Sequence, residues 1–73
     1  MVREVPIRGD VIRLGQLLKL AGVVDAGGDV KEFLAVHEVL VNGEAEARRG
    51  RQLRPGDEVS VAGDVVRLLG SGA

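Results

Sequence analysis

The fold of this chain is decided by the stretch Val39-Leu40-Val41-Asn42-Gly43-Glu44. Its apolar run predicts a strand, and its Asn-Gly pair predicts a tight hairpin turn, because both residues tolerate positive φ. Strand signals recur downstream: Val59 and Val61 alternate with polar residues, and the apolar residues Val65, Val66, Leu68 and Leu69 follow a Gly-Asp turn signal. The second half of the chain is therefore expected to form a small, mostly antiparallel sheet.

Two helices are expected upstream of this sheet. The first, over residues 13–21, carries apolar side chains at i, i+3, i+4 and i+7, and Gly22 supplies a stop signal. The second is expected over residues 26–36, with Asp25 as its N-cap. His37 is expected to end this helix at a positive φ, which His tolerates better than most residues.

One apolar core is expected between the helices and the sheet. Phe33, the only aromatic residue of the chain, is expected to be its largest member. A short strand at Val5 and Ile7 precedes the helices, and Pro6 between them indicates an edge position. These elements predict an α+β fold in which two helices pack on a small, mostly antiparallel sheet. The predicted core residues are Leu14, Leu17, Leu18, Val23, Val30, Phe33, Leu34, Val39, Val41, Leu53, Val59 and Val61.

Length and composition limit how the chain is organised. With 73 residues, a single domain over residues 1–73 is expected, because a second core would have too little apolar surface to bury. The tail over residues 70–73 is expected to be loose. The longest apolar run is far shorter than the roughly 20 residues that cross a bilayer, and the N-terminus has no signal-peptide core. A cytoplasmic protein without membrane contact is therefore expected, and a monomer is the expected oligomeric state.

Catalysis is not expected, and neither is a cofactor. The chain contains no Cys, Thr, Tyr or Trp, and its serines are Ser60 in a predicted strand and Ser71 in the tail. A nucleophile with a positioned base is therefore difficult to assemble. The sole histidine, His37, lacks a spaced set of partner ligands, so no metal site is expected either.

Four arginines fall within the seven residues Arg48-Arg49-Gly50-Arg51-Gln52-Leu53-Arg54, with no acid among them. Such clustering is costly unless an anion compensates it, and arginine forks match phosphate oxygens. The net charge of −1 does not decide whether the cluster binds an anion, because the net charge says nothing about local patches of positive charge. The alternative is a solvated loop whose arginines pair with the flanking acids Glu44, Glu46, Asp57 and Glu58.

The scarcity of aromatic residues narrows the class of nucleic acid that this cluster would bind. Single-strand binders stack bases on exposed rings, and Phe33 is expected in the core. Contacts to RNA would therefore fall on phosphates, sugars and the groove shape of folded RNA. Gly27 and Gly28 offer a second candidate anion site, because backbone amides at a helix start attract phosphate. The alternative at this pair is a flexible loop before the helix.

The order of five segments resembles the S-four-like RNA-binding domain, the type found in ribosomal small-subunit protein four. The resemblance extends over residues 12–61, and the small stand-alone bacterial members of the family are the most similar. It implies a two-helix unit on a small antiparallel sheet, called the alpha-L motif. The segments are Ile12–Lys19, Gly27–Lys31, Val39–Glu44, Arg48–Leu53 and Pro55–Val59.

The resemblance implies non-catalytic binding of structured RNA, either ribosomal RNA, a ribosome assembly intermediate or tRNA. Ribosomal or ribonucleoprotein proteins are further expected partners. The alternative function is a protein-interaction adaptor that keeps the fold with little RNA affinity. One basic face is expected, with Asp25, Glu38, Glu44, Glu46 and Asp64 largely elsewhere. The implied RNA-contacting residues are Arg13, Lys19, Gly27, Gly28, Lys31, Arg48, Arg49, Arg51 and Arg54.

Overall fold

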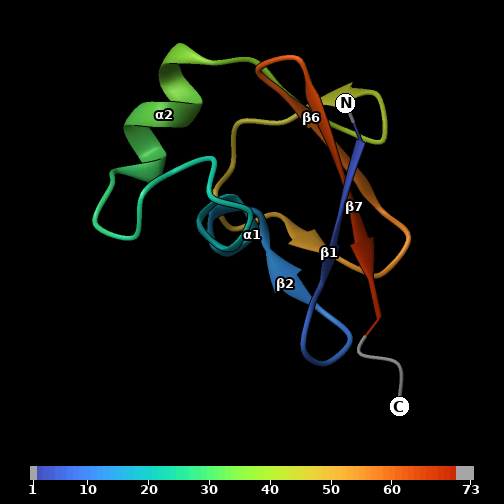
Figure 1. The fold of residues 1–73 in the computed structure, drawn as a ribbon. Coiled ribbons are helices and arrows are strands. Elements are labelled where there is room, and N and C mark those ends of the chain that lie inside the picture. Colours follow the sequence, from blue (N-terminus) through green and yellow to red (C-terminus); the bar gives the residue numbers. More distant parts are fainter. Residues whose placement is uncertain (1, 71–73) are drawn as a thin grey trace.

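The computed structural model describes residues 2–70, which form two short helices and two sheets (Figure 1). Apart from Gly70, the tail that was expected to be loose lies outside the described residues. The strands are β1 (Val2–Pro6), β2 (Ile12–Arg13), β3 (Val39–Val41), β4 (Glu44–Ala45), β5 (Gln52–Leu53), β6 (Glu58–Val61) and β7 (Asp64–Leu69), and the helices are α1 (Leu14–Leu20) and α2 (Val30–Val36).

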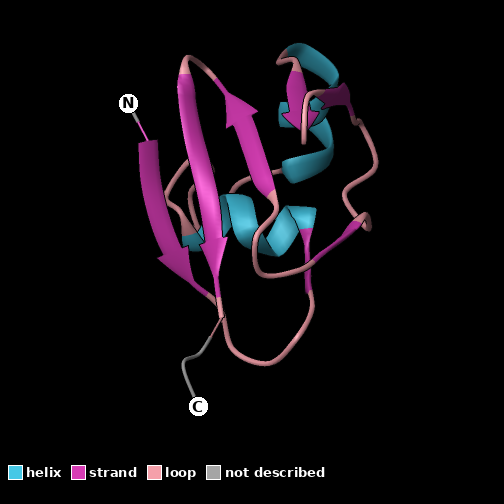
Figure 2. Ribbon diagram, turned by 90° about the vertical axis from the view of Figure 1, so that its right-hand side faces the viewer, coloured by secondary structure: helices cyan, strands magenta, loops and turns pink. Residues whose placement is uncertain are grey.

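The larger sheet has five strands in the order β1-β7-β6-β3-β4. Its pairings are antiparallel except that of β1 with β7, which is parallel and aligns Val2 with Val65. β1 is an edge strand, the position that Pro6 predicts. Both helices lie on the same side of this sheet, with α1 against it and α2 farther out (Figure 1 and Figure 2). The predicted α+β fold is confirmed. The sequence did not predict that the first and last strands, β1 and β7, pair in parallel.

The two helices differ in how closely they match the prediction. α1 covers its predicted span to within one residue at each end, but α2 begins only at Val30. Its N-cap is Asp29, not Asp25, and the Asp29 carboxylate accepts a hydrogen bond from the backbone N–H of Glu32 at 3.1 Å. The segment before the cap contains two glycines, which disfavour helix, and it forms a turn instead.

The core lies between α1 and the inner face of the larger sheet. Leu14, Leu17, Leu53 and Val59 are each 0% exposed. Two residues assigned to the core, Val23 and Phe33, are only partly buried at its margin, so those assignments are wrong. Five buried residues are absent from the predicted set, and all of them lie in segments next to the predicted core elements. They are Ile7, Ala21, Val24, Val66 and Leu68.

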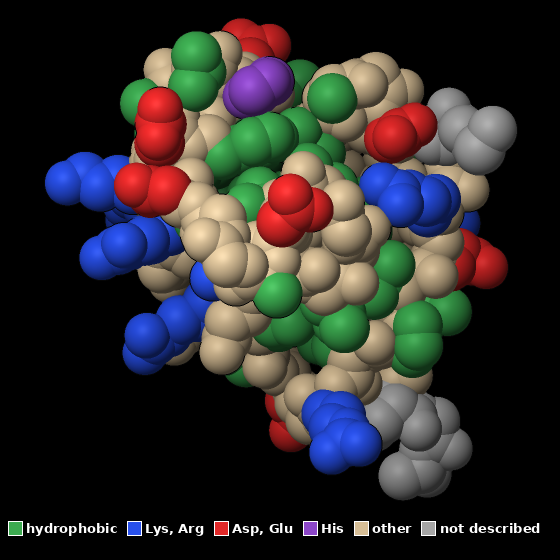
Figure 3. Space-filling view, turned by 60° about the vertical axis from the view of Figure 1, so that its left-hand side comes forward, with side chains coloured by type: hydrophobic (Ala, Val, Ile, Leu, Met, Phe, Trp, Pro, Cys, Tyr) green, Lys and Arg blue, Asp and Glu red, His purple; other side chains and the backbone are tan. Residues whose placement is uncertain are grey.

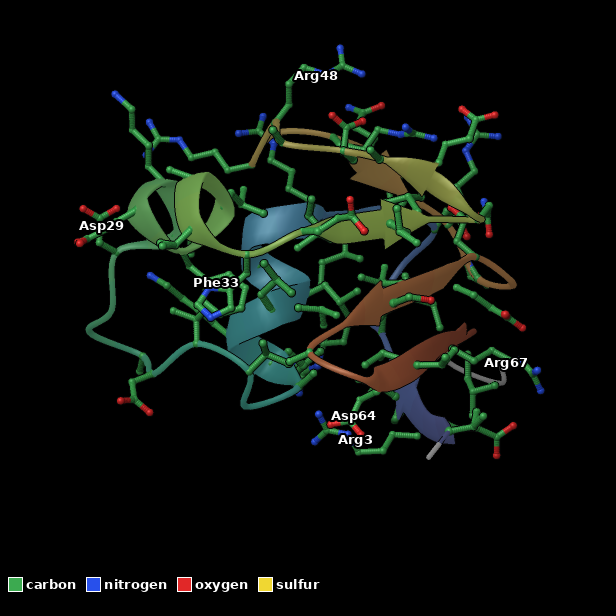
Figure 4. All side chains as sticks on the ribbon, turned by 90° about the horizontal axis from the view of Figure 1, so that it is seen from above. Arg3, Asp29, Phe33, Arg48, Asp64 and Arg67 are labelled. Carbon is green, nitrogen blue, oxygen red and sulfur yellow. The ribbon has the colours of Figure 1, made fainter. Side chains whose placement is uncertain are left out.

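Phe33 lies on the outer helix, beside His37, rather than at the centre of the molecule (Figure 4). The two rings are stacked, with centroids 4.2 Å apart and planes at 14°. His37 is the C-cap of α2, as predicted, but its φ of −116° contradicts the expected positive value. The largest apolar side chain is therefore placed on α2, where it contacts the edge of the core.

The hairpin between β3 and β4 has the predicted conformation. Asn42 has a φ of 51° and Gly43 a φ of 86°. The Asn42 side chain also fastens the turn to β6, because its Oδ1 accepts a hydrogen bond from the Glu58 N–H at 2.9 Å. The turn thus fixes both the register of β3 with β4 and the approach of the neighbouring strand.

Replacing Gly43 by Val is expected to lower the free energy of unfolding by more than about 1 kcal/mol, because a β-branched residue resists positive φ. Urea unfolding followed by circular dichroism measures the change. Ala45→Val is the control, since Ala45 is exposed in β4 and should change stability by less than about 0.5 kcal/mol. Equal stability of the Gly43 variant and the control would contradict the turn assignment.

Candidate nucleic-acid interface

The arginine-rich loop is fastened to the first turn of α1 by backbone hydrogen bonds. The Leu14 N–H donates to the Arg51 carbonyl oxygen at 2.8 Å, and the Gly15 N–H donates to the Arg49 carbonyl oxygen at 2.9 Å. These carbonyl groups satisfy two N–H groups that a helix start leaves without partners. A Cβ at Gly15 would lie 3.3 Å from Val30 Cγ1 and 3.4 Å from the Arg49 oxygen, so only glycine fits comfortably between the loop and α2.

An open hollow of about 630 Å³ lies where this loop, α1 and the start of α2 meet. Three of its residues are cations: Arg13 and Lys19 come from the N-cap and last turn of α1, and Arg49 comes from the arginine-rich loop. Asp29 is the acid on its wall, and its carboxylate is already engaged as the N-cap of α2. The remaining wall is largely glycine, which leaves backbone accessible to a ligand. The other lining residues are Gly15, Gln16, Gly27, Gly28, Val30 and Gly50.

Arg13 reaches the hollow because of the two-stranded sheet formed by β2 and β5. In this sheet Ile12 pairs with Leu53, and Arg13 pairs with Gln52. Arg13 is also the N-cap of α1, and its backbone N–H donates to Gln16 Oε1 at 3.3 Å. The short ladder therefore sets the arginine at the head of α1 beside the arginine-rich loop. The sequence gives no strong signal for it, because each of its strands has only two residues.

The glycine pair lies on the same hollow. The sequence predicted that the pair opens α2, but the helix begins after it, at Val30. Gly28 instead closes a turn, with its N–H donating to the Asp25 carbonyl oxygen at 2.8 Å, so this amide is already used. A Cβ at Gly28 would lie 2.8 Å from Val24 Cγ1, which explains the need for glycine there. Gly27 has open space around its Cα. The pair therefore shapes the wall of the hollow rather than forming a helix N-terminus.

Arg48 and Arg51 lie next to this hollow, in a second one that shares Gly50 with it. Both side chains bind Glu46. Arg48 Nε is 3.1 Å from Glu46 Oε2, and Arg51 Nη1 is 2.8 Å from Glu46 Oε1. The expectation that Glu46 would lie away from the basic face is wrong. The ion pairs with a flanking acid that the alternative expects are therefore present for these two arginines.

The hydrogen bonds from Arg48, and then those from Arg51, lower the pKa of Glu46 to about 2. The same contact raises the pKa of the Arg48 guanidinium. Each shift favours the charged form, because the hydrogen bonds between these groups are strongest when the carboxylate and the guanidinium are both ionised. The cluster is therefore a fixed pair of charges throughout the neutral range.

We expect the Glu46 contacts to survive mild acid. The folded-state pKa lies below the ordinary value of 4.5, so the stabilisation is complete above pH 4.5 and is lost as the pH falls toward 2. In a carboxyl-detected NMR titration, the Glu46 carboxyl should titrate at about pH 2. A Glu46 midpoint above pH 4 would show that the arginines do not hold this carboxylate in solution.

Two of the nine predicted contact residues line neither hollow. Lys31 is exposed in the first turn of α2, one residue after Val30. Arg54 follows β5 on the side away from Arg13, and its backbone N–H donates to Asp57 Oδ2 at 2.8 Å. The structure thus brings together seven of the predicted residues, five on one hollow and two on the next.

Other charged residues are paired on the sheet side of the molecule. Arg3 Nη2 lies 3.7 Å from Asp64 Oδ2, and Arg67 Nη2 lies 2.8 Å from Glu58 Oε2. Figure 4 shows Arg48 at one edge of the molecule and the Arg3–Asp64 pair at the opposite edge. Lys and Arg side chains gather along one edge of the view in Figure 3, with some acidic side chains beside them. Basic residues are therefore concentrated beside the two hollows, but Glu46 lies among them and Arg3 and Arg67 lie on the sheet side, so the predicted separation of charge is only partial.

Within residues 2–70, no group of three His, Asp or Glu side chains is placed to hold a metal ion. In the same part of the chain, neither helix has the length and apolarity needed to cross a bilayer. The hollow beside α1, lined by three cations and by one acid that caps α2, has the chemistry of a surface that attracts anions.

The fold and the hollow together define a small α+β domain with an anion-attracting face. A family model described as the S4 domain matches residues 5–69, and the chain belongs to this family. The resemblance seen in the order of its motifs is thereby confirmed. The chain is also 51% identical over 63 residues to a protein of Bacillus subtilis (strain 168) named "Probable ribosome maturation protein RlbA". That alignment covers 86% of this chain and 89% of the relative.

Proposed function

We propose that this chain binds structured RNA without catalysing a reaction on it. The observation that carries the proposal is the hollow that brings Arg13 and Lys19, from the N-cap and body of α1, together with Arg49 from the arginine-rich loop. Side chains that can bind phosphate are thus held on one concave surface, and glycine backbone allows a sugar–phosphate chain to approach closely. Membership of the S4 domain family supports the same function.

The preferred ligand is ribosomal RNA or a ribosome assembly intermediate, with tRNA as the alternative RNA. The support comes from the name of the Bacillus subtilis relative, which refers to ribosome maturation. Such a role would place the chain in the cytoplasm, as a monomer in contact with RNA and with neighbouring ribonucleoprotein proteins. Base stacking would contribute little, because the one aromatic ring is partly buried against His37.

The test compares a folded ribosomal RNA fragment with an unstructured single strand of equal length. We expect tighter binding of the folded RNA and a slope of log affinity against log salt of about −3, corresponding to about four neutralised phosphates. Crosslinking to cellular RNA, followed by sequencing, would identify the natural ligand. We also expect the RNA to be recovered chemically unchanged after incubation with the purified protein. Absence of salt-dependent RNA binding would refute the proposal and favour the adaptor function.

A further inference from the structure

The Glu46 carboxylate lies between Arg48 and Arg51 of the arginine-rich loop, where a surface for phosphate would be expected to avoid an acid. We propose that Glu46 is a positioning residue: its carboxylate holds Arg48 and Arg51 so that their remaining N–H groups face RNA phosphate. This inference rests on the proposed RNA-binding function and assigns a role within it to an acidic side chain.

The position of Glu46 is fixed from both its backbone and its side chain. Its backbone N–H donates to the Val39 carbonyl oxygen at 2.8 Å, which anchors the residue to β3 directly after β4 ends. Its side chain is only 7% exposed. The carboxylate is therefore a rigid, recessed group beneath the arginines, rather than a mobile acid in front of them.

The Glu46 carboxylate is saturated with donors from two neighbours. Oε2 accepts from the backbone N–H of Arg48 and from its Nε, both at 3.1 Å. Oε1 accepts from Arg48 Nη2 at 3.2 Å and from Arg51 Nη1 at 2.8 Å. An ionised carboxylate has about four acceptor sites, and all are taken. One acid therefore orients two guanidinium groups and the backbone between them.

Arg48 keeps donors for a ligand after this contact. A guanidinium has five N–H groups, and the bonds from Nε and Nη2 use two of them. The Arg48 side chain remains 77% exposed, so its outer edge faces solvent, whereas Arg51 is 35% exposed. Two arginines and one glutamate leave a net positive charge on the cluster. Since the side chains are ordered before RNA arrives, less conformational entropy is lost on binding.

A competing role for Glu46 would have the opposite effect on RNA affinity. An acid that merely occupies the place of a phosphate would weaken RNA binding, and its removal would strengthen it. The recessed position and the donors left free on Arg48 favour positioning over competition. The two roles can be separated because a glutamate-to-glutamine change alters long-range electrostatics by the same amount at any nearby site.

The test compares Glu46→Gln with Glu38→Gln as a matched control. Glu38 lines the same shallow pocket as Glu46 and is exposed, so both variants lose one negative charge in the same region. Affinity for the folded RNA fragment is measured at several salt concentrations, and Arg48 and Arg51 Nε–Hε signals are followed by NMR in the free proteins. The Glu38 variant should bind as tightly as the parent, or up to about twofold tighter.

The Glu46 variant is expected to bind at least about threefold more weakly than the Glu38 variant, although their net charges are equal. Its Arg48 Nε–Hε signal should lose the shift and narrow line of a bonded guanidinium. If Glu46→Gln does not fold, Glu46→Asp replaces it, since the shorter acid keeps the charge but not the reach to both arginines, and Glu38→Asp is then the control with the same net charge. For either variant, affinity equal to or tighter than that of the Glu38 control overturns the positioning role. Failure of the parent and Glu38→Gln to bind RNA would refute the proposed function itself, and this inference with it.

Discussion

Replacing Leu17 by Ala is expected to leave most of the protein unfolded at about 37 °C. Leu17 is 0% exposed and lies in α1 against the sheet, so truncation removes apolar contacts and leaves a cavity. Such substitutions cost about 2–5 kcal/mol, and a domain of this size has a total stability of only about 5 kcal/mol. Thermal unfolding followed by circular dichroism at 222 nm, a standard helix wavelength, measures the change.

Phe33→Ala supplies the comparison, because it removes a larger side chain from a more exposed position. Phe33 is partly buried at the margin of the core and stacks on His37, so its truncation should cost less than about 3 kcal/mol. We therefore expect the Phe33 variant to melt at a higher temperature than the Leu17 variant. The reverse order would mean that the aromatic ring, not α1, supports the core.

Replacing Arg49 by Glu is expected to weaken RNA binding by at least about tenfold and to reduce the steepness of the salt dependence by about one unit or more. Arg49 lines the hollow together with Arg13 and Lys19, so a carboxylate there would face the RNA phosphates. The contact of Arg49 with α1 is made by its backbone carbonyl, which the substitution retains. The thermal midpoint should therefore change little. Fluorescence anisotropy with a labelled RNA fragment measures the affinity.

Arg8→Glu is the control for this charge reversal. Arg8 is exposed in the loop between β1 and β2, outside both hollows, and its reversal changes the net charge by the same amount. It should weaken binding by no more than about threefold through long-range electrostatics. If both charge reversals weaken RNA binding equally, RNA affinity would depend on the overall charge of the protein, and the hollow would have no special role.

Much of the fold could be predicted from local sequence signals. The spacing of Leu14, Leu17 and Leu18 and the Asn42-Gly43 pair each reflect a short-range rule of backbone geometry, and both elements are present as predicted. The errors arose around α2, where Asp25 and Asp29 compete as N-cap and where packing decides how deeply Phe33 is buried. α2 begins at Val30 because Asp29 caps it and Gly28 is used in a turn, and Phe33 follows that helix to the margin of the core.

The candidate site was only partly accessible from the sequence. The charge pattern identified the arginines, but it could not tell which of them share a surface. Arg13 joins Arg49 through a ladder of two residue pairs, and Arg54 continues from that ladder in the other direction. The pairing of Glu46 with Arg48 and Arg51 depends on how the loop turns after β4, and no local pattern specifies that turn. The one available signal was Gly15, a poor helix former inside a predicted helix, which marks the close approach of the loop.

The parallel pairing of β1 with β7 has a consequence for the order in which the molecule assembles. Its register joins residue 2 to residue 65, so β1, the first of the described strands to be synthesised, gains its partner only when β7, the last of them, has been made. Until then β1 has no strand partner, and the edge of β6 on which β7 pairs is open. Contacts between distant positions slow folding, because a large loop must close first. On a translating ribosome the helices and the β3–β4 hairpin would form early, and the nascent chain would complete its sheet only after its last strand has left the exit tunnel.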